Sequence, residues 1–220
     1  MSFEGWVLSY FRHQISNIRY QISEPPNAQR PMPNAQRLMP MNITETNLPG
    51  LLIIDPKVFG DERGYFFESY NAELFRQAGL EMQFLQDNES RSGKGILRGL
   101  HFQEPPFEQG KLVRVARGAV MDVSVDIRKD SPTFGKWKAF ELSEQNKRML
   151  WIPPGFAHGF VTLEDNTIFI YKCTNIYNKE SENSIRWDDP ELNIDWGISD
   201  PVISEKDKAA SLFRELRSPF

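Results

Sequence analysis

The stretch Ala-Val-Met-Asp-Val-Ser-Val-Asp-Ile, residues 119–127, decides the fold class. Its side chains fall into two alternating sets, one made of Val120, Asp122, Ser124 and Asp126 and the other of Met121, Val123, Val125 and Ile127. In a β-strand successive side chains point to opposite faces, whereas a helix has a period near 3.6 residues. The stretch therefore predicts a strand whose two faces differ in polarity.

Short runs of the same type recur along the chain, separated by turn-forming residues. We expect further strands at residues 51–58, 65–67, 82–86, 95–102, 111–116, 137–142, 148–152, 158–163 and 167–177. Two short helices are expected, one over residues 71–78 with Asn71 as its N-cap and Gly79 after its end, and one over residues 204–216 capped by Ser204. Many short strands with few helices predict a mainly β protein, an antiparallel sandwich or jelly roll.

The composition limits the classes of function. The chain has 220 residues and a formal net charge of −4, so a broad basic face for nucleic acid is not expected. No apolar run approaches the ~18 residues of a membrane span, and no secretory signal is evident. Cys173 is the sole cysteine, which excludes an intramolecular disulfide and favours a reducing compartment. We expect a cytoplasmic protein that binds neither nucleic acid nor membrane.

The first part of the chain differs from the rest. The sequence Pro-Asn-Ala-Gln-Arg occurs at residues 26–30 and again at residues 33–37, among further prolines that disfavour regular structure. We expect an irregular N-terminal extension over residues 1–41 and one compact domain over residues 42–220. The extension is a functional arm, an organelle transit peptide or an inessential segment before a natural start at Met41, and the last of these is favoured.

Three histidines are present, and His13 lies in the extension. His101 ends an expected strand, on which Gly99 and Gln103 would share its face, and such neighbours suit a cavity better than a packed core. His158 follows a rigid turn that contains two prolines and begins another strand. Taken alone, either histidine also fits a structural role.

A metal site needs separate consideration, because jelly rolls often bind a metal through two histidines and a carboxylate. Two ligands on one strand face need a spacing of two, and the sequence has no His-x-His pair. We expect no catalytic metal. His101, His158 and a carboxylate could still form a metal site, and the geometry of the fold decides whether they meet. Acid–base chemistry suits a histidine better, since its pKa lies near neutrality. Tyr171 is then a candidate proton donor, against the ordinary alternative of a tyrosine at a sheet edge.

Several longer segments carry a specific resemblance. They are Pro-Lys-Val-Phe-Gly-Asp-Glu-Arg-Gly at residues 56–64, Gln-Asp-Asn at 86–88, Leu-Arg-Gly-Leu-His-Phe-Gln at 97–103, Gln-Gly-Lys-Leu-Val-Arg at 109–114, Trp-Ile-Pro at 151–153, Gly-Phe-Ala-His-Gly-Phe at 155–160 and Tyr-Lys-Cys-Thr at 171–174. In this order they resemble the signatures of the dTDP-4-dehydrorhamnose 3,5-epimerases. The likeness runs from about residue 48 to residues 204–207, and the extension lies outside it.

The resemblance implies a cupin-type antiparallel jelly roll with a few short helices, usually a homodimer, that acts without a metal or organic cofactor. The implied reaction inverts C3 and C5 of a dTDP-linked 4-keto-6-deoxyhexose, dTDP-4-dehydro-6-deoxy-D-glucose, to give dTDP-4-dehydro-L-rhamnose in dTDP-L-rhamnose biosynthesis. His101, paired with Asp207, would abstract the protons, and Tyr171 would reprotonate the opposite face. Lys111 would stabilise the enolate at the 4-keto oxygen. From local sequence alone, Asp207 is instead a helix-capping carboxylate three residues after Ser204.

The family pattern also implies a set of substrate-binding residues, namely Arg63, Glu68, Gln86, Asn88, Arg98, His158 and Lys206. Arg63 and Arg98 suit a diphosphate, since guanidinium groups match phosphate oxygens. Gln86 and Asn88 could bind the edges of the thymine. Without the family context, Arg63 would be a surface turn residue and Glu68 a solvated strand residue.

One position departs from the family pattern. Relatives that invert both carbons often carry two adjacent tyrosines after the Tyr-Lys-x-Thr segment, where this chain has Ile176 and Tyr177. A single-carbon 3- or 5-epimerase, or a ketoisomerase of another dTDP-deoxysugar pathway, therefore stays open. A non-catalytic sugar-nucleotide-binding cupin is a further alternative, and a metal-dependent dioxygenase or isomerase is disfavoured by the missing His-x-His pair.

Overall fold

The computed structural model describes residues 41–220, which form β-strands joined by loops and a few short helices. The strands are β1 (Met41–Glu45), β2 (Leu52–Pro56), β3 (Phe59–Asp61), β4 (Gly64–Phe66), β5 (Gln86–Ser92), β6 (Leu97–Gln103), β7 (Lys111–Arg117), β8 (Ala119–Asp126), β9 (Trp137–Ser143), β10 (Met149–Ile152), β11 (Phe156–Thr162), β12 (Thr167–Cys173) and β13 (Glu182–Ser184). The helices are α2 (Ala72–Gln77), α3 (Glu205–Lys208) and the 3-10 turn η1 (Phe213–Glu215). His13 and the extension predicted over residues 1–41 lie outside this range, apart from Met41, which begins β1.

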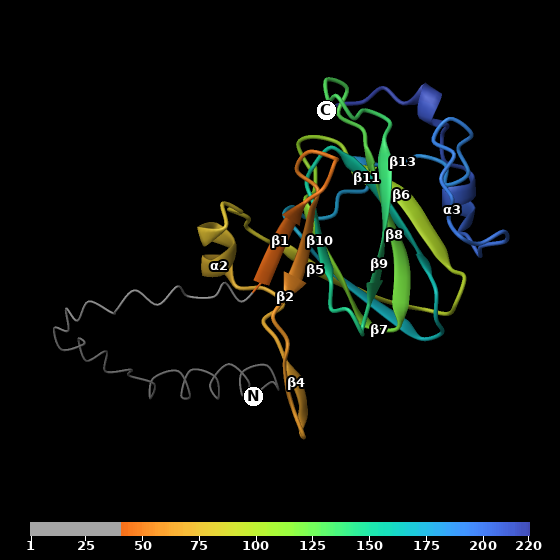
Figure 1. The fold of residues 1–220 in the computed structure, drawn as a ribbon. Coiled ribbons are helices and arrows are strands. Elements are labelled where there is room, and N and C mark those ends of the chain that lie inside the picture. Colours follow the sequence, from red (N-terminus) through yellow and green to blue (C-terminus); the bar gives the residue numbers. More distant parts are fainter. Residues whose placement is uncertain (1–40) are drawn as a thin grey trace, which may run out of the picture. The chain divides into compact units, whose positions relative to one another are not determined.

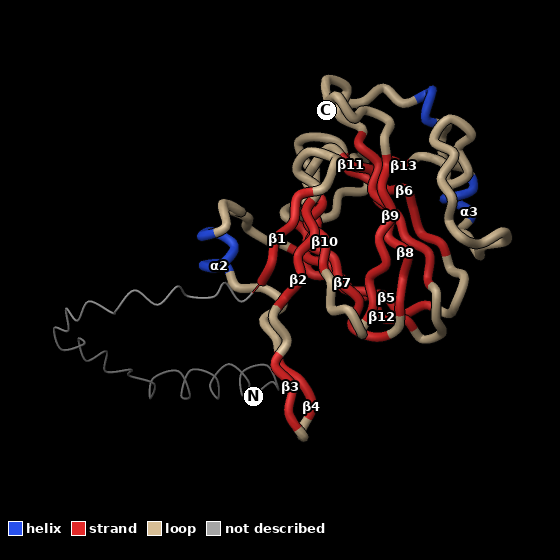
Figure 2. Tube along the Cα trace, viewed as in Figure 1, coloured by secondary structure: helices blue, strands red, loops and turns tan. Residues whose placement is uncertain are grey.

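Two antiparallel sheets face each other across the core (Figure 1). One has six strands in the order β1-β2-β10-β7-β12-β5, and the other has five in the order β13-β6-β11-β8-β9. A separate hairpin, β3 with β4, projects away from both sheets (Figure 2). Neighbours in each sheet are often far apart in sequence, as in β2 with β10 and β6 with β11, which is typical of a jelly roll.

Strand β8 confirms the alternation that predicted it, and its polar side faces inward. Val123 and Val125 pack outward against the C-terminal segment, in a cluster with Trp196. On the opposite face, Asp122 and Ser124 are fully buried between the sheets. Buried polar side chains cost free energy unless they are hydrogen-bonded. Their position therefore points to a polar site inside the sandwich.

Apolar side chains fill three clusters around this polar region. The cluster between the sheets includes Val113, Val115, Val120, Phe140, Leu142, Leu150, Ile152, Phe156, Phe160 and Phe169. The second lies on the outer face of the five-stranded sheet, under the C-terminal segment, and the third lies under helix α2 on the six-stranded sheet. Burial of this apolar surface, at about 25 cal/mol per Å², stabilises the sandwich and fixes the strands that carry the site.

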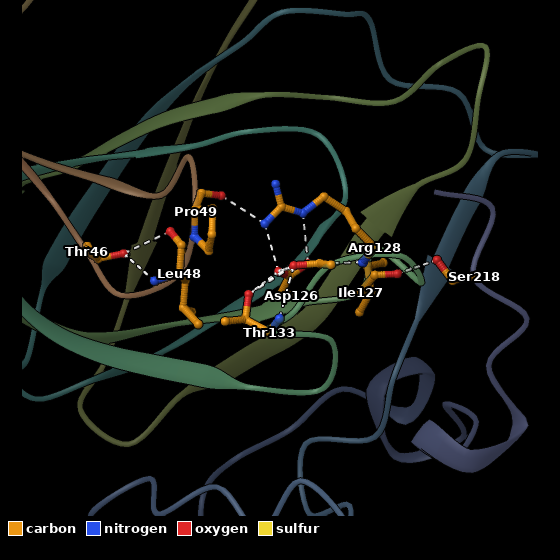
Figure 3. A network of polar contacts seen from close by, with 9 residues as sticks. Thr46, Leu48, Pro49, Asp126, Ile127, Arg128, Thr133 and Ser218 are labelled. Carbon is orange, nitrogen blue, oxygen red and sulfur yellow. Dashed lines mark hydrogen bonds and ion pairs between the residues drawn. The ribbon is translucent and has the colours of Figure 1, made fainter.

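A polar network at one end of β8 ties three distant segments together (Figure 3). The buried carboxylate of Asp126 accepts hydrogen bonds from the Arg128 guanidinium at 2.8 and 2.7 Å and from the Thr133 hydroxyl at 2.6 Å. Arg128 also donates to the carbonyl of Pro49 at 2.8 Å, and Ser218 donates to the carbonyl of Ile127. These contacts hold the loop before β2 and the chain end against the sheet.

Most of the predicted elements are confirmed, with three corrections. The predicted strand at residues 82–86 is wrong, because Met82 and Phe84 pack toward α2, and the polar strand β5 begins at Gln86. The predicted helix over residues 204–216 is limited to α3 and η1, and strands β1, β3, β5 and β13 were not predicted. Asn71 caps α2 as predicted, accepting hydrogen bonds from the Glu73 and Leu74 amides. The fold class, a mainly β antiparallel jelly roll of cupin type, is confirmed.

No helix within residues 41–220 has both the length and the apolar character that crossing a membrane requires.

Candidate active site

A pocket of about 320 Å³ opens between the two sheets. Its lining comes from both sheets and the connecting loops and comprises Gln86, Asn88, His101, Phe102, Gln103, Gln109, Lys111, Tyr171, Tyr177 and Glu182. Strands β5, β7 and β12 supply one wall, and β6 and β13 supply the other. Five of the predicted site residues therefore line a single cavity, namely Gln86, Asn88, His101, Lys111 and Tyr171.

His101 is paired with Asp207, which follows it by more than a hundred residues. The imidazole Nε2 lies 2.6 Å from Oδ1 of Asp207, whose side chain is only 4% exposed. Burial alone would raise the pKa of the Asp207 carboxyl, but hydrogen bonds from His101 and from the Gly99 amide hold that pKa below its usual value. A carboxylate can only accept, so Nε2 donates the hydrogen bond and Nδ1 keeps the lone pair of a base.

Helix α3 explains how Asp207 reaches His101. The Ser204 hydroxyl accepts a hydrogen bond from the Asp207 amide at 3.1 Å and so caps the helix. Because Ser204 satisfies the backbone of Asp207, the Asp207 carboxylate is free to bond to His101. The cap is therefore the Ser204 hydroxyl, and the Asp207 carboxylate, which local sequence alone assigned to capping, pairs with His101.

Lys111 and Tyr171 enter the pocket from the opposite sheet. Strands β7 and β12 are adjacent, with Tyr171 beside Val113 and Cys173 beside Lys111 in register. Burial lowers the pKa of the Lys111 ammonium, although the negative charges of Asp122 and Glu182 act in the other direction. Burial raises the pKa of the Tyr171 phenol, which therefore keeps its proton at neutral pH. The pocket thus places the imidazole of His101 on one wall, and the phenol of Tyr171 and the amine of Lys111 on the other.

His158 lies behind the pocket rather than in its lining. It is 8% exposed, and its Nε2 is 2.8 Å from Oδ2 of Asp122. In register it stands beside His101 on one side and Ser124 on the other, so the two histidines are cross-strand neighbours. His158 therefore lies beside His101 on the neighbouring strand and, contrary to the predicted substrate contact, lines neither the pocket nor the hollow next to it.

Arg98, Lys206 and Asp207 line a second hollow, of about 410 Å³, which shares His101 with the first pocket. Arg98 donates to the Ser92 hydroxyl at 3.3 Å. Lys206 forms an ion pair with Glu182, which lines the first pocket. Two cationic side chains therefore line the second hollow together with His101.

Arg63 and Glu68 line neither of these hollows. Arg63 lies at the turn of the β3–β4 hairpin, is 85% exposed and pairs with Asp61. Glu68 follows the hairpin and accepts a hydrogen bond from the Asn71 amide at 3.0 Å. Within one chain, the structure does not bring these two residues to His101.

Five residues of the pocket lining were not among the predicted site residues, namely Phe102, Gln103, Gln109, Tyr177 and Glu182. The Tyr177 hydroxyl donates to Oε2 of Glu182 at 2.8 Å. Glu182 lies on β13, whose sequence Glu-Asn-Ser has no apolar residue and gives no strand signal. Ile176 is 51% exposed and is not among the lining residues, so its side chain lies outside the pocket.

Among residues 41–220, no three His, Cys, Asp or Glu side chains gather in a geometry suited to a metal ion. Each of the two histidines is instead bonded to a carboxylate of its own.

Comparison with known proteins identifies the family. The family model described as dTDP-4-dehydrorhamnose 3,5-epimerase matches residues 45–215. The dTDP-4-dehydrorhamnose 3,5-epimerase of Shigella flexneri is 55% identical over 168 residues, which cover 76% of this chain and 93% of that protein. The solved dTDP-6-deoxy-D-glucose-3,5-epimerase of Legionella pneumophila, in complex with dTDP-4-keto-L-rhamnose, has a TM-score of 0.77 at 52% identity, covering 80% of this chain and 94% of that chain.

A 3'-monoepimerase from Streptomyces bikiniensis, solved with dTDP-quinovose, is more distant. Its TM-score is 0.73 at 33% identity, covering 76% of this chain and 85% of that chain. The match over residues 45–215 and the high identities show that this chain is an epimerase and belongs to the dTDP-4-dehydrorhamnose 3,5-epimerase family.

Proposed function

We propose that this enzyme inverts C3 and C5 of dTDP-4-dehydro-6-deoxy-D-glucose and yields dTDP-4-dehydro-L-rhamnose. The observation that carries the proposal is the placement of His101 with Asp207 on one wall of the pocket and Tyr171 with Lys111 on the other. Inversion of a carbon requires removal of a proton from one face and delivery of a proton to the opposite face. Two walls with opposite roles meet that requirement.

His101 is the proposed base. Asp207 holds the imidazole through Nε2, so Nδ1 is available to take the proton next to the 4-keto group. The imidazolium that forms is stabilised by the adjacent carboxylate, much as an acidic partner orients the histidine of a hydrolase triad.

Lys111 is the proposed site of enolate stabilisation. Loss of the proton leaves negative charge on the 4-keto oxygen, and a fixed ammonium in a largely dry pocket interacts with that charge more strongly than water does. Each tenfold in rate corresponds to about 1.4 kcal/mol of transition-state stabilisation. The proposed reaction needs no metal or organic cofactor, because Lys111 supplies the positive charge that a metal ion would otherwise supply.

Tyr171 is the proposed acid. Its phenol, on β12, gives a proton to the carbon face opposite His101, and the enolate electrons form the new C–H bond. The imidazolium then loses its proton and the phenolate regains one from solvent. C3 and C5 both flank the keto carbon, so one base can serve both after the ring shifts.

Nucleotide binding is proposed for the rest of the predicted set. Arg98 and Lys206 flank His101 with positive charge, which suits the diphosphate next to the sugar. Gln86 and Asn88 present amide groups in the pocket and suit the thymine or the deoxyribose.

We further propose a homodimer in which the β3–β4 hairpin of one subunit reaches the pocket of the other. Arg63 and Glu68 lie on or beside this hairpin, away from their own pocket. The hairpin also exposes Val58, Phe59, Tyr65 and Phe66, which are 43–65% exposed. Contiguous exposed apolar side chains are typical of an interface. A twofold contact would cover them and bring Arg63 to the partner subunit's substrate.

Inversion of both carbons is favoured over inversion of one. Of the two positions at residues 176 and 177, the one that lines the pocket keeps its tyrosine, Tyr177, and the departure from the family pattern falls at Ile176, outside the lining. The 3,5-epimerases of Shigella flexneri and Legionella pneumophila share 55% and 52% identity with the chain, whereas the 3'-monoepimerase shares 33%. A cytoplasmic location stays a prediction.

Proton exchange tests the proposal. The enzyme is incubated in deuterated water with dTDP-4-keto-6-deoxyglucose, and deuterium at each sugar carbon is followed by NMR. We expect deuterium at both C3 and C5 with the wild type, and a loss of about 10³-fold or more in exchange rate with His101→Ala. Exchange at one carbon only would establish a single-carbon epimerase. No exchange, with the substrate bound and the protein folded, would leave only a sugar-nucleotide-binding protein.

A further inference from the structure

Three pocket-lining glutamines hold the same short stretch of main chain, the segment of residues 175–178 that follows β12. The Gln109 amide donates to the carbonyl of Asn175 at 2.8 Å, and the Gln86 amide oxygen accepts from the Tyr177 amide at 2.7 Å. Gln103 makes two further bonds to the segment. The glutamines come from three different places in the chain, at the start of β5, the end of β6 and the loop before β7.

Gln103 is the centre of this arrangement. Its Nε2 donates to the carbonyl of Phe107 at 2.6 Å and to that of Ile176 at 3.1 Å, and its Oε1 accepts from the Asn178 amide at 2.8 Å. The side chain is only 5% exposed. Buried hydrogen bonds of this kind are costly to lose, because the partners are left unsatisfied. One amide therefore joins the loop before β7 to the segment after β12.

The segment places a pocket side chain. It carries Tyr177, whose main-chain amide is held by Gln86 and whose hydroxyl donates to Glu182. Tyr177 and Glu182 both line the pocket, and Glu182 pairs directly with Gln103 in the β13–β6 register. A shift of the segment would therefore move the phenol ring relative to a bound sugar.

We propose that Gln103 is a positioning residue that acts on the reaction through residues 175–178 and fixes Tyr177 over the sugar. The inference rests on the proposed function and adds to it a residue that touches no reacting atom. Gln103 is two residues from His101 on the same strand, β6. The strand that carries the proposed base therefore also holds residues 175–178 in place. The position of Tyr177 would then govern how the ring sits between His101 and Tyr171, and so the balance between C3 and C5.

Only an amide satisfies all three contacts. Methionine has a similar length but can neither donate nor accept strongly, and glutamate can accept from the Asn178 amide but cannot donate to the two carbonyls. Gln103→Met and Gln103→Glu therefore separate loss of the whole arrangement from loss of its donor half. A matched control is Asn146→Ala, because Asn146 also makes three side-chain bonds to main chain, in the β9–β10 turn away from the pocket.

The test measures kcat, KM and the ratio of C3 to C5 deuterium exchange for both Gln103 variants, alone and combined with Tyr177→Phe. We expect Gln103→Met to lower kcat/KM by about 10- to 100-fold and to change the exchange ratio. The loss for Gln103→Glu should be at least as large, because its buried carboxylate would face two carbonyl oxygens. In the Tyr177→Phe background the further loss should shrink to about twofold, because both changes act through one group.

Additive losses in the double variant, or an exchange ratio unchanged from the wild type, would overturn the inference. So would an effect no larger than that of Asn146→Ala. If Gln103→Met fails to fold, Gln103→Glu with Tyr177→Phe gives the same cycle. Absence of exchange in the wild type would reject the proposed function itself, so the two failures are distinct.

Discussion

At the scale of single residues, the site depends on one carboxylate held from two sides. The Asp207 amide is bonded to Ser204, and its carboxylate receives His101 and the Gly99 amide. Hydrogen bonds to a carboxylate lower its pKa and so keep it ionised beside the imidazole. Asp207 thereby sets both the orientation of His101 and the nitrogen that stays basic.

The two groups on the opposite wall predict a pH dependence. Burial lowers the pKa of Lys111 and raises that of Tyr171, so on raising the pH Lys111 loses its proton first. We expect kcat/KM to fall at alkaline pH because the ammonium that stabilises the enolate becomes neutral. Lys111→Arg should move this alkaline limb to higher pH, since a guanidinium stays charged.

The matched control is Tyr171→Phe, which should lower the rate and leave the limb where it is. The profile of kcat/KM against pH for the three proteins checks this, because it reports the ionisations of the free enzyme. A limb that disappears with Tyr171→Phe and not with Lys111→Arg would contradict the assignment.

At the scale of elements, alternation predicted well the strands that have one apolar face, such as β8. It failed for β5, whose side chains are polar because one face lines the pocket and the strand lies at the edge of its sheet. It also missed β13, which is too short and polar to show a period. Polarity required by the site thus obscured the strands that build it.

The strand pattern of the sequence could predict only some of the site residues. Strand spacing singled out His101 and Tyr171 from the residues themselves. Asp207 and Lys111 came from the family resemblance, because no local pattern pairs Asp207 with His101, 106 positions before it, or shows that Lys111 faces the same cavity. Glu182 and the contacts of Gln103 depend on how the loops close over the pocket, and only the fold provides that.

The close approach of β6 to β11 leads to a prediction about stability. Gly99 has a φ of +136°, and a Cβ there would lie 2.4 Å from the Cα of Gly159. Gly99→Ala should force apart the strands that carry His101 and His158, and lower the free energy of unfolding by about 3 kcal/mol. Urea unfolding monitored by circular dichroism measures this.

Gly64→Ala is the control, because Gly64 has a similar φ of +127° with nothing within 4 Å of the added carbon. It should cost about 1 kcal/mol or less, from the backbone angle alone. Equal losses for the two variants would show that strand contact at Gly99 is not the cause.

At the scale of the whole molecule, the hairpin separates the predicted site residues into two groups. Those on the two sheets meet in one subunit, and Arg63 and Glu68 do not reach them. The proposed homodimer reconciles this separation with the resemblance, since each complete site would then contain residues of two chains.

Mixed dimers test this arrangement directly. Arg63→Ala and His101→Ala are each expected to lose most activity as homodimers. In a heterodimer of the two, purified through two different tags, one pocket has an intact His101 and receives the intact Arg63 of the partner chain. That pocket should be fully active and the other inactive, so the heterodimer should show about half of the wild-type rate. If the hairpin instead serves its own pocket, every site in the heterodimer carries a defect and no activity returns. An Arg63→Ala homodimer as active as the wild type would remove Arg63 from the site altogether. Sedimentation of each species confirms that two chains are present, so a lost rate cannot be attributed to dissociation.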